Sequence, residues 1–170
     1  MKFSFIRAAI VSWFAVLSGC SRADNGVEPG AQEADRHQLI LAVENQGASG
    51  EQLAIDLQYT RKSSAPGPRV MEAFLRFSDN LRYSSATQGE AIVAAGKTLV
   101  VQERSNSLLR IMAFSATSIS ELDTGLLATL RFEKTGTGTA TLEILTDRPI
   151  FAPAEIYQGL LVSDPLRIAL

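Results

Sequence analysis

Large apolar residues recur at every second position along most of the chain after residue 37. Residues 53–60 are typical, because they read Leu-Ala-Ile-Asp-Leu-Gln-Tyr-Thr, with the bulkier apolar side chains on one phase. A period of two predicts β-strands that bury one face. By the same criterion we expect strands at residues 39–43, 53–60, 71–77, 97–104, 108–115, 126–133, 140–144 and 166–170.

Turn-forming residues separate these runs. Residues 63–68 contain two prolines and a glycine, Gly136-Thr137-Gly138 stands between two strands, and Ser105-Asn106-Ser107 indicates a hairpin turn. Further turn signals are Asp147-Arg148-Pro149 and Asp164-Pro165, and no stretch shows a sustained helical period. Short strands with frequent turns predict an all-β fold, an antiparallel β-sandwich of the jelly-roll type with about nine strands.

Residues 1–20 have the order of parts of an export signal. Lys2 and Arg7 supply positive charge, and an apolar stretch runs from Ala8 to Leu17. This stretch is shorter than the ~20 apolar residues that span a bilayer. Leu17-Ser18-Gly19-Cys20 resembles the lipobox of bacterial lipoproteins. The resemblance implies cleavage before Cys20, a diacylglycerol on its thiol and an acyl chain on its new amine. A plain secretory signal followed by an odd cysteine is the alternative.

The chain accordingly divides into three parts. We expect a signal peptide at residues 1–19, the lipidated Cys20 with a flexible linker at residues 20–36, and a β-sandwich domain at residues 37–170. The linker is rich in Gly, Pro, Asp and Glu, so it buries too little apolar surface to offset the entropy cost of ordering.

The acyl chains would anchor the protein to a membrane. The residue after Cys20 is Ser21 and not Asp, which resembles the outer-membrane class of Gram-negative lipoproteins. We therefore expect a lipid-anchored protein of the cell envelope, at the outer membrane in a Gram-negative host.

The net charge narrows the choice of partner, and the cysteine content excludes an internal disulfide. The formal net charge of the chain is −2, and it becomes −4 once Lys2 and Arg7 leave with the signal. A mildly acidic domain is a poor ligand for nucleic acid, because binding phosphates needs a basic face. Cys20 is the only cysteine, so the exported domain forms no internal disulfide.

The residue types give no catalytic or metal-binding constellation. His37 is the only histidine, and it stands beside the linker, a poor place for a general base or a zinc ligand. Strand alternation puts Glu72, Glu133 and Glu143 on solvent faces and not across a cleft. Glu121-Leu122-Asp123 offers too few oxygen ligands for calcium. We expect a protein that is not an enzyme and has no cofactor or metal.

Three blocks of sequence resemble the cohesin family. Residues 74–83 read Phe-Leu-Arg-Phe-Ser-Asp-Asn-Leu-Arg-Tyr, residues 109–115 read Leu-Arg-Ile-Met-Ala-Phe-Ser, and residues 125–132 read Gly-Leu-Leu-Ala-Thr-Leu-Arg-Phe. Their order and spacing match the family within residues 39–170. The resemblance implies the jelly-roll fold that cohesins share with several carbohydrate-binding modules. The matched positions are core and turn residues, Asp79-Asn80 being typical of a turn.

Cohesins present a flat sheet face to a dockerin, so the resemblance implies a protein partner here, dockerin-like or other. Glu72, Phe74 and Arg76 share the outward phase of one predicted strand, and we expect them to form the binding face. Phe74 is the aromatic of interest on this phase: either it is exposed, or a loop or the neighbouring strand covers it.

Recognition of a polysaccharide or oligosaccharide is the alternative, which the same superfamily resemblance permits. Sugar rings stack on planar aromatics, and Trp13, the only tryptophan, leaves with the signal. Tyr59 and Phe77 fall on the inward phase of their strands. A broad stacking strip is therefore not expected, whereas a small oligosaccharide site stays open. A purely structural envelope component is a further alternative.

Overall fold

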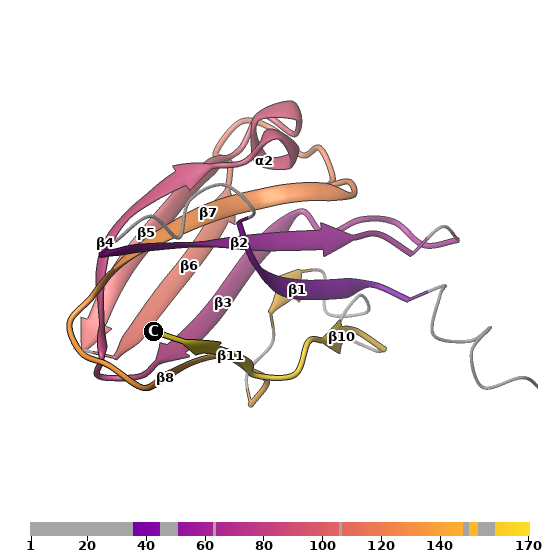
Figure 1. Ribbon diagram of the computed structural model, residues 1–170. Coiled ribbons are helices and arrows are strands. Elements are labelled where there is room, and N and C mark those ends of the chain that lie inside the picture. Colours follow the sequence, from indigo (N-terminus) through magenta and orange to yellow (C-terminus); the bar gives the residue numbers. More distant parts are fainter. Residues whose placement is uncertain (1–35, 45–50, 63, 106, 148–149, 153–158) are drawn as a thin grey trace, which may run out of the picture.

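The computed structural model describes residues 36–44, 51–62, 64–105, 107–147, 150–152 and 159–170 (Figure 1). The predicted signal peptide, Cys20 and nearly all of the linker lie outside these residues. The described residues contain eleven strands and one short helix: β1 (Gln38–Val43), β2 (Gln52–Thr60), β3 (Val70–Phe77), β4 (Leu81–Gln88), α2 (Glu90–Ala94), β5 (Thr98–Ser105), β6 (Leu108–Phe114), β7 (Gly125–Lys134), β8 (Thr139–Leu145), β9 (Phe151–Ala152), β10 (Leu161–Val162) and β11 (Leu166–Ala169).

The strands form two sheets that pack on each other (Figure 1). One sheet has five strands in the order β10-β1-β2-β7-β4. The other has six, in the order β11-β8-β3-β6-β5, with β9 also pairing with β3. The pairs are antiparallel except for β1 with β10. The predicted antiparallel β-sandwich is confirmed.

Each of the eight strands predicted from alternation begins and ends within one residue of its expected bounds. β4 and α2 are the longer elements that the pattern did not predict. Along β4 only Leu81 is buried, because this strand is the edge of its sheet and most of its side chains meet solvent. α2 has five residues, too few for a helical period to be recognised. In the described part of the chain, no helix is long and apolar enough to cross a membrane.

The core lies between the two sheets and is formed by the side chains at every second position of the strands. On β3, Met71, Ala73, Leu75 and Phe77 are at most 2% exposed. Phe132 of β7 faces them from the opposite sheet, and its ring centroid lies 5.2 Å from that of Phe77. The alternation in the sequence is therefore the alternation between core and surface.

His37 lies in the core, which corrects the expectation that it stands at a flexible end. It is 3% exposed, and its Nδ1 lies 2.6 Å from the Tyr59 hydroxyl and 3.3 Å from the backbone N–H of Lys62. Because that N–H only donates, Nδ1 is an acceptor and the Tyr59 hydroxyl donates to it. Burial raises the pKa of Tyr59 well above its ordinary value, so the hydroxyl keeps its proton. His37 thus fastens the start of β1 to β2.

Replacing Tyr59 by phenylalanine should lower the free energy of unfolding by about 1–3 kcal/mol, because His37 loses a buried hydrogen-bond donor. The raised pKa adds a pH dependence. The stability that Tyr59 contributes is fully present below about pH 10 and is lost as the pH rises above it, since only the unfolded chain then releases the proton. Urea unfolding of both proteins at about pH 7 and about pH 10.5 measures the two effects.

Tyr83→Phe is the matched control. The Tyr83 side chain is half-buried, and its hydroxyl makes no hydrogen bond within the described residues. Its loss should change the free energy of unfolding at neutral pH by less than about 0.5 kcal/mol. Equal losses in the two variants would show that the contact with His37 contributes nothing.

Candidate functional site

Glu72, Phe74 and Arg76 lie together on one surface, the outer face of the six-stranded sheet. The residues between them on β3 belong to the core, so these three point to the opposite side. They stand opposite Met112, Arg110 and Leu108 of β6 in the antiparallel register. The sequence therefore grouped them on the correct face, and their part in binding stays a prediction.

Phe74 lies on the outer face but is covered, which is the alternative that the sequence left open for it. The residue is 9% exposed. Arg110 on β6 and Leu145 on β8 stand directly opposite it on its two sides. Directly opposed side chains on one sheet face lie close enough to cover one another. Phe74 therefore offers little surface to a partner.

The two charged residues of the predicted face are each held in an ion pair. Nε of Arg110 donates to Oε1 of Glu72 at 2.7 Å, and Nη1 of Arg76 lies 3.7 Å from Oε2 of Glu143 on β8. Both pairs join neighbouring strands, and both are partly exposed. They form a polar border on this face.

Next to this border lie apolar side chains that the sequence analysis missed. Phe114 and Val70 are each 41% exposed, and Val100 and Met112 are half-buried. Val100 stands opposite Met112, which stands opposite Glu72. We name Val70, Val100, Met112 and Phe114 the apolar strip. The signal for it was present, because residues 108–114 carry large apolar side chains on both phases of the strand.

The outer face of the five-stranded sheet is different in character. Its central strands present Asp56 and Gln58 from β2 and Thr129 and Arg131 from β7, with Asp56 directly opposite Thr129. The Thr129 hydroxyl donates to Oδ1 of Asp56 at 2.7 Å. A shallow hollow of about 380 Å³ on this side is also lined mainly by polar residues. The outer face of the five-stranded sheet is thus largely polar, whereas that of the six-stranded sheet carries the apolar strip.

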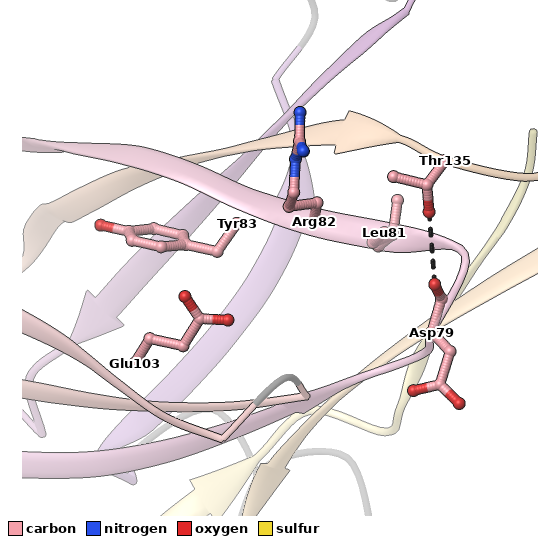
Figure 2. Close-up of a pocket in the computed structure, with 6 residues that line it drawn as sticks. All are labelled: Asp79, Leu81, Arg82, Tyr83, Glu103 and Thr135. Carbon is pink, nitrogen blue, oxygen red and sulfur yellow. Dashed lines mark hydrogen bonds between the residues drawn. The ribbon is translucent and has the colours of Figure 1, made fainter.

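A pocket of about 660 Å³ opens at the side of the sandwich, between the edge strands β4 and β5 (Figure 2). Gln88 closes the gap between these strands at one end. Its amide nitrogen donates to the carbonyl of Lys97 at 3.1 Å, and its amide oxygen accepts from the N–H of Leu99 at 3.2 Å. The pocket lies nearer the other end of this gap. Its lining residues are Asp79, Leu81, Arg82, Tyr83, Glu103 and Thr135.

Glu121, which the sequence offered as a calcium ligand, and Asp79 of the predicted turn both have structural partners. Oε2 of Glu121 accepts from the backbone N–H of Gly67 at 2.9 Å and lies 3.3 Å from Nη2 of Arg61. Oδ1 of Asp79 accepts from the Ser107 hydroxyl at 2.6 Å. Among the described residues no group of three or more His, Cys, Asp or Glu side chains could hold a metal ion.

The architecture is similar to that of solved cohesin domains. The sixth cohesin of scaffoldin B from Acetivibrio cellulolyticus, solved with a Cel5 dockerin, superposes with a TM-score of 0.61 at 17% identity. The match covers 79% of this chain and 99% of that cohesin.

Two further cohesins agree. The second type II cohesin of the adaptor scaffoldin ScaA from Acetivibrio cellulolyticus gives a TM-score of 0.61 at 15% identity, over 78% of this chain and 89% of that one. The seventh ScaB type I cohesin of Pseudobacteroides cellulosolvens gives 0.55 at 12% identity, over 79% and 91%. The chain has the cohesin-like jelly-roll fold. No protein-family model and no curated protein matches it.

Proposed function

We propose that this chain is a non-catalytic binding domain that presents the outer face of its six-stranded sheet to a protein partner. The observation that carries the proposal is the apolar strip of Val70, Val100, Met112 and Phe114, bordered by the Glu72–Arg110 ion pair. Protein interfaces have apolar centres and polar rims, and exposed aromatic and methionine side chains are enriched in them. Within the described residues, the central strands of the other sheet present polar side chains such as Asp56, Gln58 and Thr129 on their outer face.

The likeness to cohesins supports a protein as the ligand. One of the similar cohesins is solved in complex with a dockerin. We infer a dockerin-like partner here, meaning a small domain that docks against a sheet face. Glu72 and Arg76 would lie in the rim of the contact, and Phe114 and Met112 in its centre.

Changing Phe114 to aspartate tests this assignment. A partner is captured from an envelope extract of the source organism on the immobilised full chain, identified by mass spectrometry, purified and titrated by calorimetry. Phe114→Asp should weaken its binding by at least about tenfold, because a charge replaces an apolar contact at the centre of the interface.

Gln58→Asp on the polar face is the matched control, since it adds the same charge to an exposed strand position of the other sheet. It should bind like the parent. If both variants bind equally well, the partner uses another surface. If no purified protein binds the parent, the proposal of a protein ligand is wrong.

Lipid anchoring at Cys20 belongs to the same proposal. The order of Lys2, Arg7, the apolar stretch and Leu17-Ser18-Gly19-Cys20 supports it. The domain would then be tethered through residues 21–36 to the cell envelope, at the outer membrane in a Gram-negative host.

Cys20→Ala should abolish labelling with radioactive palmitate and move the protein from the membrane pellet to the soluble fraction. A thioether needs the thiol, and each buried CH₂ of an acyl chain contributes about 0.8 kcal/mol to membrane binding. Ser21→Ala is the control and should label and pellet like the parent. A Cys20→Ala protein that still labels and pellets would contradict the assignment of a lipobox.

Recognition of a polysaccharide on a sheet face has less support. A stacking platform needs several exposed aromatics in a row. Among the described residues, Phe114 is the one exposed aromatic on a sheet face, because Phe74 is covered and Tyr59 lies in the core.

A further inference from the structure

The pocket between β4 and β5 has a chemistry that the proposed protein-binding face does not use. It lies between an edge strand of one sheet and an edge strand of the other, and it is open to solvent on the side of the sandwich. Its volume of about 660 Å³ is within the range of small-molecule sites, about 300–1,000 Å³. Figure 2 shows the carboxylate of Glu103 on β5 turned toward the ring of Tyr83 on β4 across this gap.

The ring of Tyr83 is supported from behind. It packs edge-on against Phe132 of the core, with the ring centroids 6.0 Å apart and the planes at 69°. Burial and, to a lesser degree, the nearby Glu103 carboxylate raise the pKa of Tyr83. The phenol therefore stays uncharged at neutral pH. A rigid, neutral aromatic ring thus forms one wall of the pocket.

The Glu103 carboxylate on the opposite wall has no balancing positive charge within the pocket. Glu103 forms no hydrogen bond or ion pair with any of the described residues. Arg82, the one cation of the lining, pairs with Glu133 on β7, and its side chain extends away from Glu103 (Figure 2). The space between Tyr83 and Glu103 is therefore bounded by an aromatic ring and an unpaired carboxylate.

We propose that this pocket binds an organic cation of the alkylammonium class, held between the Tyr83 ring and the Glu103 carboxylate. The electron-rich face of an aromatic ring attracts such cations, and a carboxylate adds a direct charge interaction. A bare metal ion is a poorer occupant, because calcium takes six to eight oxygen ligands and the described residues contain no suitable cluster. The site lies apart from the apolar strip and does not depend on it.

Isothermal titration of the full chain with choline tests the proposal against its uncharged carbon isostere, 3,3-dimethylbutan-1-ol. Choline should bind at least about tenfold more tightly, and rising salt should weaken it. Glu103→Gln should reduce choline affinity by about tenfold, since it keeps the shape of the side chain and removes its charge. Tyr83→Phe should retain binding because it keeps the ring.

Glu143→Gln on β8 is the matched control, because it removes a partly exposed carboxylate outside the pocket lining. It should bind choline like the parent. Equal binding of choline and the isostere, or unchanged binding by Glu103→Gln, overturns the proposal. The proposal is also overturned if choline does not bind at tens of millimolar, or if cellobiose binds to the chain and choline does not. Thermal unfolding of each variant confirms that it is folded.

Discussion

Gly89→Ala is expected to destabilise the domain by about 3 kcal/mol or more, the largest loss we predict from adding a single methyl group. Gly89 links β4 to α2 and has an ordinary extended backbone, with φ −83° and ψ 165°. Its conformation therefore does not require glycine. What requires glycine is space, because a Cβ built there lies 2.1 Å from the carbonyl oxygen of Leu126 on β7.

Neither side of this contact is free to move. The N–H of Gly89 donates to the carbonyl of Leu127 at 2.9 Å, so the two chains are bonded at this point. Leu127 itself is fully buried. Relieving the overlap would break that hydrogen bond and shift β7, which pairs with β2 and β4. Thermal and urea unfolding measure the loss, which we expect as a fall in both midpoints.

Gly138→Ala separates steric overlap from backbone strain. Gly138 has a φ of +98°, but nothing lies within 4 Å of an added Cβ. Its replacement should cost about 1 kcal/mol, through conformational strain alone. If Gly89→Ala costs no more than Gly138→Ala, the close approach of Gly89 to β7 is not a constraint on the fold.

The sequence predicted the strands well because burial and alternation have one physical origin. Leu53, Ile55 and Leu57 alternate with smaller or polar residues because one side of β2 faces the other sheet. Where that asymmetry fails, the prediction fails. β4 is exposed on most of its length, and so its sequence has no period to read.

The candidate site was harder to predict. Alternation of apolar and polar residues predicts on which face of the sheet a side chain lies, but it does not predict whether neighbouring side chains bury it. Glu72, Phe74 and Arg76 were assigned to the correct face. Whether Phe74 is accessible depends on Arg110 and Leu145, which only the register brings beside it. The pocket could not be found from the sequence at all, since Tyr83 and Glu103 belong to different sheets and no local pattern relates them.

Phe132→Ala should lower the free energy of unfolding by about 3–5 kcal/mol, because it leaves a cavity where the two sheets meet. Phe132 is fully buried, and its ring contacts Phe77 of the opposite sheet and Tyr83 of its own. Phe114→Ala is the control: the same change at an exposed position should cost less than about 1 kcal/mol. Equal losses by urea unfolding would contradict a core centred on Phe132. Since Tyr83 rests on Phe132, any Phe132→Ala protein that still folds should also bind choline more weakly, which ties the proposed cation pocket to the packing beneath it.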